Sequence, residues 1–582
     1  MNSIVTFKKS FLSFIQQLFG LSAEQIASID VTLNADKDAA TFGDLSCNAA
    51  MVLARVLGKN PRQLATEIIQ AVGADTELCT VIEKIEIAGP GFLNITLTKQ
   101  TWQQLARELL TTKRDVFTGV DNPKRYLLEF VSANPTGPLH LGHGRNGIIG
   151  DVMGRVLKFL GHQVATEFYI NDAGSQMGLL GLSLQVRCKQ QLGIEAGLPE
   201  EGYRGEYMVE LAQQCVAEHG KTVLEKELSF FTDYAMQHLL TLQQKDLANY
   251  GIHFDQWFSE KTLHQSGQVE ATIKILQERD LVYEEGGALW FKSTQFGDDK
   301  DRVIRKATGE LTYIAADIAY HKNKFDRGYD VLIDILGQDH HGYVKRLKAT
   351  MQALGYNADA LDVILYQLVT IKENDVAVRM SKRAGTFTKL SDVVDEVGTD
   401  VARFFYLHRK ADTHLEFDLA TALKKTDENP VFYIHYAYVR ALSVLAKAQQ
   451  EVALKQVVDS LPLVVSLSNH ASAQILRQAQ DERTVEGEEI LALLSPNDIA
   501  LLKKILSLRD ILSSIERTYQ TNILANYAWE LAHSFHSYYA GNRVIDPENV
   551  EVSKMRLLMV VMAKDALEVC LDLLGLTKPE RM

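Results

Sequence analysis

Residues 129–144 read Glu129-Phe-Val-Ser-Ala-Asn-Pro-Thr-Gly-Pro-Leu-His140-Leu-Gly-His143-Gly, and they are the most informative segment of the chain. It overlaps a short apolar run, YLLEFVS, and precedes a helix-like segment, IIGDVMGRVLKFLGH, and a second strand-like run, VATEFYIND. A strand, a turn-rich loop, a helix and a second strand make one βαβ unit, which predicts a parallel sheet. Ligands of such sheets bind at the carboxyl ends of the strands, where this loop lies.

The loop carries two histidines where the following helix is expected to begin. His140 and His143 are three residues apart, so on a helix they share one face. Backbone amides and the helix dipole at that end favour phosphate groups, and a pair of imidazoles can donate hydrogen bonds to a phosphate chain whose charge rises during displacement. Gly142 between them lets a ligand approach the backbone. Taken alone, the pair is equally compatible with two surface histidines.

A dehydrogenase is the rival interpretation of the same loop. Gly142, Gly144 and Gly147 spell GxGxxG, and Glu167 follows near the end of the next strand. That fingerprint should follow its strand at once, whereas here the chain runs on from Ser132 through a proline-containing loop before the first glycine. The motif is therefore weak evidence for a dinucleotide site.

A second basic motif lies downstream, in VAVRMSKRAGTFTKLSD. It places Arg379, Lys382, Arg383 and Lys389 around a loop between strand-like and helix-like sequence. Positive charge there suits the developing charge of a pyrophosphate leaving group. By itself, the segment is also compatible with a solvated basic turn.

Composition excludes several classes of protein. The chain has 582 residues, of which 46% are hydrophobic and 23% charged, and this is the profile of an ordinary globular protein of several domains. The net charge of −13 disfavours indiscriminate coating of nucleic acid. The five cysteines form no CxxC pair, so we expect neither a disulfide framework nor a cysteine zinc site. No apolar run reaches the ~18 residues of a membrane span, and we expect a cytoplasmic protein without membrane contact.

Glycine usage divides the chain into regions. Residues 1–425 hold 34 of the 37 glycines, and residues 426–582, which hold three, read as a helical bundle. We predict an N-terminal α+β domain over 1–120, with an amphipathic first helix and a hairpin made of VIEKIEI and FLNITLT. A parallel-sheet catalytic domain follows over 121–425, with a mainly helical insertion around 185–300. Residues 466–489 lack a clean apolar face, and we assign them no role.

The two motifs, in this order and within an α/β frame, resemble those of the class I aminoacyl-tRNA synthetases. His140-Leu-Gly-His143 matches the HIGH signature, and Arg379-Met-Ser-Lys382-Arg383 is a degenerate KMSKS loop that retains the central lysine and has Arg379 and Arg383 in place of the outer Lys and Ser. The closest resemblance is to the arginyl-tRNA synthetases, on EFVSANPTGPLHLGH, IAGPGFLNI, NPVFYIHYAYVR and the terminal LLGLTKPERM. It implies a multidomain α/β protein: a Rossmann-like catalytic domain, an N-terminal extra domain that touches the tRNA elbow, and a helical anticodon-binding bundle.

Recognition of a free guanidinium group requires carboxylates that accept paired N–H donors. Glu129, at the end of the first strand, and Asp317, in LTYIAADIAYH, are the candidates, although Asp317 also fits an exposed helical acid and Tyr313 a packing role. Asp339-His340-His341 is also compatible with a metal site, but no third ligand cluster accompanies it, so we expect no protein-bound metal.

Together, the motifs and the resemblance imply four groups of functional residues. The catalytic residues are His140, His143 and Lys382. The ATP-binding residues are Pro138, Leu139, Gly142, Gly144, His340, Met380, Ser381 and Arg383. The arginine pocket consists of Glu129, Asn134, Tyr313, Asp317 and Gln338.

The fourth group is a face of the first bundle helix. Pro430 marks the start of that helix, with Asn429 as its cap. Asn429, Tyr433, Tyr436 and Arg440 follow at helical spacing and suit unstacked anticodon bases, although core packing of the tyrosines is equally compatible with the pattern.

The reaction implied is the ligation of arginine to tRNA through an arginyl-adenylate, with ATP carrying its own Mg²⁺. The implied partners are tRNA, arginine and ATP, and we expect a monomer.

Overall fold

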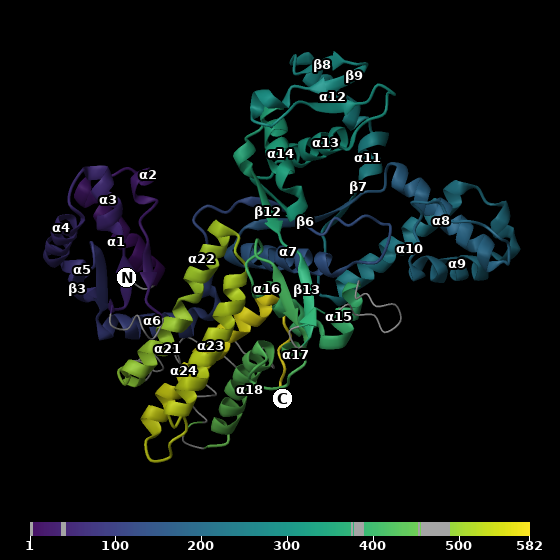
Figure 1. Ribbon diagram of the computed structural model, residues 1–582. Helices are drawn as coiled ribbons and strands as arrows, with labels where there is room; N and C mark the ends of the chain where they lie inside the picture. Colours follow the sequence, from purple (N-terminus) through teal and green to yellow (C-terminus); the bar gives the residue numbers. More distant parts are fainter. Residues whose placement is uncertain (1–3, 36–41, 374–375, 378–388, 452–453, 455–488) are drawn as a thin grey trace, which may run out of the picture.

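The computed structural model describes residues 4–35, 42–373, 376–377, 389–451, 454 and 489–582. Figure 1 shows a small N-terminal unit, a central α/β body with two projections, and a helical bundle formed by the C-terminal part of the chain. The predicted residues Met380, Ser381, Lys382 and Arg383 lie outside the described residues, as does the stretch 466–488.

The central sheet has five strands in the order β12-β11-β5-β6-β7, and every neighbouring pair is parallel. Its strands are β5 (Arg125–Glu129), β6 (Gln163–Ile170), β7 (Gln256–Ser259), β11 (Val331–Gly337) and β12 (Leu361–Tyr366). Helix α7 (Leu141–Leu160) crosses from β5 to β6 and buries most of its side chains. The predicted βαβ unit and parallel sheet are therefore confirmed.

The N-terminal unit is built on an antiparallel sheet of order β1-β2-β4-β3. The predicted hairpin is confirmed as β3 (Ile82–Ala88) and β4 (Phe92–Leu97), with Ile85 opposite Ile95. The first helix, α1 (Ile4–Phe19), is amphipathic and buries Phe7 and Phe11, whereas Leu18 is exposed. The other elements are α2 (Ala23–Ile26), β1 (Val31–Leu33), β2 (Leu45–Cys47), α3 (Ala49–Leu57), α4 (Pro61–Ala74), α5 (Thr76–Val81) and α6 (Lys99–Thr112).

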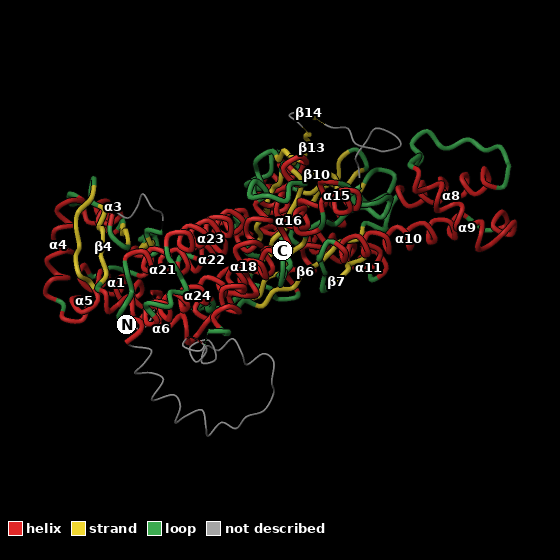
Figure 2. Tube along the Cα trace, turned by 90° about the horizontal axis from the view of Figure 1, so that it is seen from below, coloured by secondary structure: helices red, strands yellow, loops and turns green. Residues whose placement is uncertain are grey.

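Two projections interrupt the sheet. Helices α8 (Ser175–Gln191), α9 (Glu206–His219) and α10 (Leu228–Asn249) extend away from the body in both views, and we call them the helical unit (Figures 1 and 2). Strand β7 then returns to the sheet inside the stretch predicted as an insertion. The second projection consists of α11 (Glu260–Gln265), α12 (Gln268–Glu278), β8 (Val282–Glu285), β9 (Ala288–Phe291) and β10 (Arg302–Arg305).

Two helices after β10 pack against the sheet and its projections: α13 (Tyr313–Asp326) and α14 (His341–Ala353). A small sheet of order β14-β13-β15 follows. Its surroundings are β13 (Val369–Glu373), β14 (Val376–Ala377), α15 (Leu390–Val397), α16 (Thr399–Leu407), β15 (Leu415–Asp418) and α17 (Leu419–Ala422).

The C-terminal bundle contains five described helices: α18 (Pro430–Ala448), α21 (Pro496–Leu506), α22 (Leu508–Thr518), α23 (Asn522–Gly541) and α24 (Val550–Leu574). It touches the N-terminal unit through ion pairs, among them Lys8 Nζ with Asp510 Oδ1 at 2.5 Å. The expected fold class, an α/β catalytic region between an N-terminal α+β unit and an all-α bundle, is confirmed. No helix in the part of the chain that the structure describes is both long and apolar enough to cross a bilayer.

Candidate functional site

The candidate site lies at the carboxyl edge of the parallel sheet. Strand β5 ends at Glu129, and the loop 130–140 leads from there into α7. Strands β6 and β7 lie on one side of β5, and β11 and β12 lie on the other. The connection from β5 runs to β6 on one side, and the connection from the adjacent β11 runs to β12 on the other. Such a divergence of connections opens a crevice for ligands.

The two histidines of this loop form the start of α7. His140 is the N-cap: its Nδ1 accepts a hydrogen bond from the Gly142 amide at 3.0 Å. In return, Nδ1 of His143 accepts one from the His140 amide at 3.1 Å, and the two rings stack with their centroids 3.6 Å apart. Because each Nδ1 is an acceptor, the neutral ring carries its proton on Nε2.

Both imidazoles are neutral at physiological pH. Burial, together with a smaller contribution from the neighbouring His140, lowers the pKa of His143 to about 3. Burial also lowers the pKa of His140. The pair therefore provides two neutral Nε2–H donors at a helix N-terminus, and this arrangement suits an anionic ligand.

The chain returns to this pair immediately after residues 378–388. Lys389 forms a β-bridge with His140, and the Leu390 amide donates to the Leu139 carbonyl oxygen at 2.8 Å. Leu390 also packs on Gly144, where an added Cβ would come within 2.6 Å of its side chain. The Leu139 side chain and Gly144 are buried, so both join the two segments through packing.

The other predicted ATP-binding residues lie around the same edge. Gly142 donates its amide to the His140 ring, and Pro138 is half-buried in the loop. His340 is exposed in the turn that follows β11, with its Nε2 3.7 Å from an oxygen of Asp339. The described residues contain no group of three or more side chains arranged to hold a metal ion.

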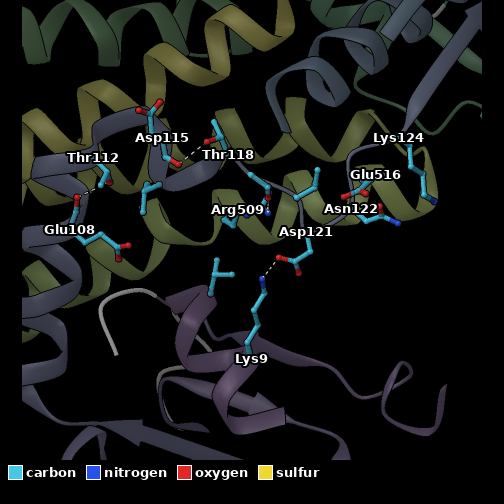
Figure 3. Close-up of a pocket in the computed structure, with 14 residues that line it drawn as sticks. Lys9, Glu108, Thr112, Asp115, Thr118, Asp121, Asn122, Lys124, Arg509 and Glu516 are labelled. Atoms are coloured by element: carbon cyan, nitrogen blue, oxygen red, sulfur yellow. Dashed lines mark hydrogen bonds and ion pairs between the residues drawn. The ribbon is translucent and has the colours of Figure 1, made fainter. Parts of the chain in front are cut away.

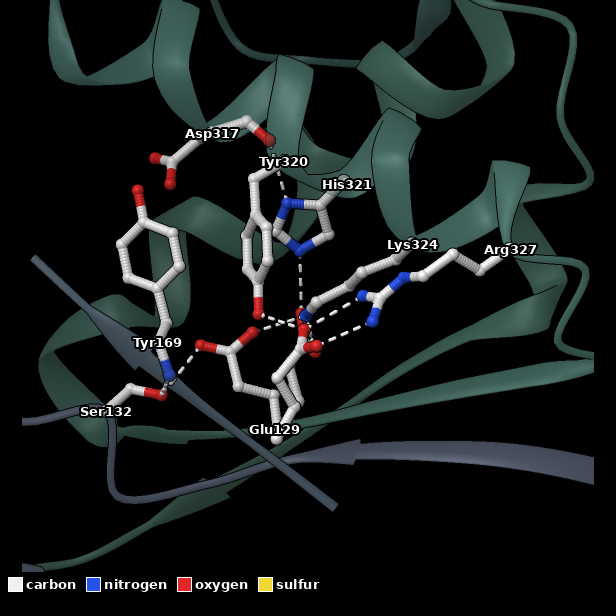
Figure 4. Close-up of polar contacts among 10 residues, drawn as sticks. Glu129, Ser132, Tyr169, Asp317, Tyr320, His321, Lys324 and Arg327 are labelled. Carbon is white, nitrogen blue, oxygen red and sulfur yellow. Dashed lines mark hydrogen bonds and ion pairs between the residues drawn. The ribbon is translucent and has the colours of Figure 1, made fainter. Parts of the chain in front are cut away.

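Three acids stand in a row across the middle of the sheet. The strand register sets Asp334 of β11 beside Glu129 of β5, and Glu129 beside Glu167 of β6. All three are buried. Like charges side by side on a sheet repel, so each acid needs a cation above it. Helix α13 provides these cations (Figure 4). Lys324 forms ion pairs with both Glu129 and Asp334. Arg327, at the C-terminal end of the helix, donates to both carboxylate oxygens of Glu167, at 2.6 and 2.9 Å.

His321 completes this row of charges. Its Nε2 lies 2.7 Å from an Asp334 oxygen, and its Nδ1 lies 2.9 Å from the Asp317 carbonyl oxygen. Both ring nitrogens face acceptors, and this arrangement favours the protonated ring. Burial and Lys324 lower the pKa of His321, but Asp334 outweighs them and the net shift is upward. Both carboxylate oxygens of Glu129 have partners: Lys324 contacts one, and Ser132 Oγ donates to the other at 2.9 Å.

The carboxylate of Asp317, also on α13, forms no ion pair with a described residue. Burial is the main cause that raises the pKa of Asp317, to about 7; Glu129 and Glu260 act in the same direction, and His321 and Lys324 act against it. Figure 4 shows the Tyr169 ring, from β6, with its hydroxyl pointing toward this carboxylate. A carboxyl group that is partly protonated near neutral pH and whose ionised form is stabilised by a bound cation is suited to a guanidinium ligand.

Glu260 is a site residue that the sequence analysis missed. It is the first residue of α11, directly after β7, and it is buried. Its charge and its hydrogen bond with Tyr169 both contribute to the raised pKa of that tyrosine, after burial. The signal was present in the sequence, because Glu260 follows a strand of the same sheet, but that strand lay within the stretch assigned to an insertion.

The remaining predicted arginine-pocket residues differ in exposure. Tyr313 begins α13, one turn before Asp317, and is 61% exposed. Asn134 is exposed in the loop after β5, and its Nδ2 donates to Gln176 Oε1 at 3.2 Å. Gln338 is half-buried directly after β11. All three therefore come from segments at the carboxyl edge of the sheet or from α13.

The predicted tRNA face of α18 needs one correction. Asn429 is buried, and its amide donates to the carbonyl oxygens of Ala422 and Lys424 while its oxygen accepts from the Val431 amide. The predicted cap is confirmed, and it occupies the whole side chain. We therefore remove Asn429 from the face.

The other three residues do share a face. Tyr436 is 41% exposed, Arg440 lies 4.3 Å from its ring centroid, and Arg440 Nη2 donates to its hydroxyl at 2.5 Å. Tyr433 is partly buried against His533 and His536 of α23. An aromatic and guanidinium surface of this kind suits unstacked bases.

A separate cavity of about 590 Å³ lies between the N-terminal unit and α22 (Figure 3). Lys9 and Asp121 form an ion pair at 2.5 Å beside it, and burial raises the pKa of Glu108 to about 7. On its far side, Arg509 donates to the Gly119 carbonyl oxygen. These elements are not those of the sheet edge, so we treat the cavity as part of the domain interface.

Comparison with known proteins identifies the family. Residues 105–411 match the catalytic domain of the class I tRNA synthetases of the arginine type, residues 6–97 the arginyl-tRNA synthetase N-terminal domain, and residues 466–582 the DALR anticodon-binding domain. The chain is 41% identical to the arginine–tRNA ligase of Solidesulfovibrio magneticus, over 95% of this chain and 96% of that protein. It is 40% identical to the arginine–tRNA ligase of Bacillus subtilis, over 96% of each.

A solved structure shares the fold. The arginyl-tRNA synthetase of Thermus thermophilus superimposes with a TM-score of 0.74 over the whole of both chains, at 19% identity. The family models, the identity over nearly the full length and the shared architecture agree. The chain belongs to the arginyl-tRNA synthetases, the class I ligases that attach arginine to tRNA at the expense of ATP.

Proposed function

We propose that the carboxyl edge of the sheet activates arginine with ATP and that the same edge then passes the arginyl group to tRNA. In the first step the arginine carboxylate attacks the α-phosphorus in line, forming arginyl-adenylate and releasing pyrophosphate. In the second, the terminal adenosine hydroxyl of tRNA takes the arginyl group and AMP leaves. Neither step requires a covalent intermediate on a side chain, so positioning and charge stabilisation carry the catalysis.

The observation that carries this proposal is the start of α7. Two neutral imidazoles expose Nε2–H donors there, and the chain returns at Lys389 beside them. His140 and His143 would donate to the phosphates, and Lys382, seven residues before Lys389, would stabilise the leaving pyrophosphate. Pro138, Gly142, His340, Met380, Ser381 and Arg383 would surround the nucleotide, with Leu139 and Gly144 packing beneath it.

We assign the guanidinium group to Asp317. Tyr169 and Glu260 would complete its surroundings, because both act on Asp317 or on each other through charge and hydrogen bonding. Glu129, Asn134, Tyr313 and Gln338 would line the rest of the pocket. Because Glu129 is already neutralised by Lys324, its role would be to accept a hydrogen bond from the ligand rather than to form the principal ion pair.

The remaining assignments follow from the family and from the surfaces described above. Mg²⁺ would arrive with the phosphates of ATP, a hard cation that keeps much of its own hydration shell. The N-terminal unit would meet the tRNA elbow, and the α18 face would meet the anticodon. We propose a cytoplasmic monomer.

The His143→Ala variant tests the nucleotide site. One hydrogen bond to a charged phosphate is worth about 1.5–3 kcal/mol, so the kcat of arginine-dependent ATP–pyrophosphate exchange should fall about 10- to 150-fold. The KM for arginine should stay within about twofold, since the guanidinium group is assigned to Asp317 and not to this ring. His219→Ala, at the end of α9, is the control and should behave as the parent chain. An unchanged kcat would remove His143 from catalysis.

The Tyr436→Ala variant tests the tRNA face. Stacking of one base on an aromatic ring is worth about 1–3 kcal/mol, so the Kd for tRNA should rise about 5- to 150-fold. Tyr436→Phe keeps the ring and loses only the hydroxyl that accepts from Arg440, and its Kd should stay close to that of the parent chain. Filter binding at fixed salt measures both. Equal affinities for the two variants would mean that Tyr436 does not stack on tRNA.

A further inference from the structure

The helical unit reaches back to the loop that carries the catalytic histidines. Each of its helices sends one polar side chain to the loop segment 134–137. Gln176 of α8 accepts from Asn134 Nδ2 at 3.2 Å, and Tyr207 of α9 donates from its hydroxyl to the Thr136 carbonyl oxygen at 2.8 Å. Gln243 of α10 donates to the carbonyl oxygens of Asn134, at 3.0 Å, and Gly137, at 2.8 Å. The loop is thus held by three helices that lie outside the sheet.

Gln243 is the innermost of these contacts. Its side chain is 1% exposed, although it is polar and lies on a helix that projects from the body. Both hydrogens of its amide are committed to carbonyl oxygens of the loop. The amide nitrogen of Gln243 thus satisfies two carbonyl oxygens of the loop, and loss of this donor would leave both of them without it. The contact therefore fixes the loop at two points, three residues apart.

Tyr207 is fitted tightly against the loop. A Cβ at Gly137 would lie 3.3 Å from its hydroxyl oxygen, and a Cβ at Gly205 would lie 2.3 Å from its ring. A side chain at position 205 would therefore collide with the ring, and one at position 137 would crowd its hydroxyl. Tyr203 also takes part, through a hydrogen bond with the Thr136 side chain. The backbone at Thr136 is therefore fixed from the side of the helical unit, four residues before His140.

Helix α10 is in turn anchored to the rest of the catalytic region. At its end, the carbonyl oxygen of Tyr250 accepts from Arg403 Nη1 at 2.9 Å, and that of Gly251 accepts from Arg155 Nη2 at 3.2 Å. Arg155 belongs to α7, and both arginines also bind Asp151 of α7. The helix that begins with the two histidines and the helix that carries Gln243 are thus tied together.

We propose that Tyr207 and Gln243 are positioning residues of the activation step, which hold segment 134–137 so that His140 and His143 reach the phosphates of ATP. The inference rests on the nucleotide site proposed above. Neither side chain touches the histidines, so both act through the loop. The helical unit then holds the loop of the active site in position, in addition to any contact that it makes with tRNA.

The test compares two variants with a matched control in the full-length chain. Tyr207→Phe removes one hydroxyl and keeps the ring, and Gln243→Met keeps the length and removes both donors. Tyr234→Phe, in α10, removes a hydroxyl that donates to Glu218 within the helical unit and does not reach the loop. Arginine-dependent ATP–pyrophosphate exchange is measured for each with saturating tRNA, together with the KM for ATP and the thermal midpoint.

We expect Tyr207→Phe to lower the kcat of exchange about tenfold and Gln243→Met about 100-fold, because small displacements of catalytic groups have effects of this order. Tyr234→Phe should match the parent chain. If Tyr207 acts by placing His143, then Tyr207→Phe should cost less than about twofold in a His143→Ala background, since the two changes remove the same contribution. If Tyr207 contributes to stability alone, the loss of kcat in the double variant should equal the product of the losses in Tyr207→Phe and His143→Ala.

Two outcomes would overturn the inference while leaving the nucleotide site intact. One is a loss of kcat in the double variant equal to the product of the two single losses. The other is a kcat of Tyr207→Phe equal to that of Tyr234→Phe. A His143→Ala variant with unchanged exchange would instead remove the proposed nucleotide site. If Gln243→Met does not fold, Tyr207→Phe and its double variant decide alone, because the isosteric change preserves the packing.

Discussion

The Lys324→Met variant is expected to lose about 3–5 kcal/mol of free energy of unfolding, because it leaves two buried carboxylates without their shared cation. Lys324 is fully buried, and its ammonium group bridges Glu129 and Asp334. On the neighbouring strand, a third acid, Glu167, lies beside Glu129. The carboxylate of Glu129 therefore cannot move away from Asp334 without approaching Glu167. Urea denaturation, followed by a probe in the catalytic region, measures the loss.

The electrostatic origin of the effect makes its pH dependence predictable. Burial alone would raise the pKa of Asp334, but Lys324 and His321 outweigh it and hold that pKa below its usual range. The stabilisation by Asp334 is therefore present above the unfolded pKa of about 3.9 and is lost as the pH falls below it. The parent chain should lose more stability than Lys324→Met between pH 5 and pH 3.

Adding Asp334→Asn and Glu129→Gln to Lys324→Met is the control. With no charge left on either acid, at least half of the lost stability should return, because removing a whole buried ionic group costs less than removing one partner. A single variant within about 1 kcal/mol of the parent chain would show that water or neighbouring groups compensate the acids.

The sequence predicts the elements whose side chains repeat at a clear period. The βαβ unit around residues 126–170, the hairpin made of β3 and β4, and the cap of α18 at Asn429 are all found where they are predicted. In each case the decisive contacts are local in the chain, such as a strand and its turn or a cap and its helix. The positions of His140 and His143 at a helix start belong to the same category.

The contacts that the sequence does not reveal are those set by tertiary packing. From the sequence, Lys324 is expected to be a solvent-exposed lysine on a helix. It is a buried cation only because Glu129 and Asp334 lie beneath α13. Glu260 was missed because β7 has only four residues and follows a long helical stretch. Gln243 appears polar and unremarkable until α10 is placed against the loop. Glu129 lies 195 positions from Lys324, and Asn134 lies 109 positions from Gln243, and no local pattern encodes such contacts.

Asp317→Asn is expected to increase the KM for arginine by a factor between about 30 and several thousand. The reason is that loss of one partner of a buried hydrogen-bonded charge pair costs about 2–5 kcal/mol. The amide keeps the shape of the carboxyl group and removes its charge, so the variant isolates the electrostatic contribution. The KM for ATP should stay within about twofold. Asp326→Asn, an exposed acid on the same helix, is the control and should leave both constants unchanged.

The pH dependence separates this role from simple packing. The pKa of Asp317 is about 7 because burial disfavours its charge, with Glu129 and Glu260 adding to the effect. Arginine binds the ionised form, so the KM for arginine should fall as the pH rises from about 5.5 and level off above about 7.5, with one proton released on binding. The same shift means that the folded chain holds a proton which the unfolded chain has lost between about pH 4 and 7, so this group favours folding less as the pH rises. In Asp317→Asn the pH dependence of the KM should be absent, and a parallel dependence in both proteins would assign the titration to another group and leave Asp317 with a packing role.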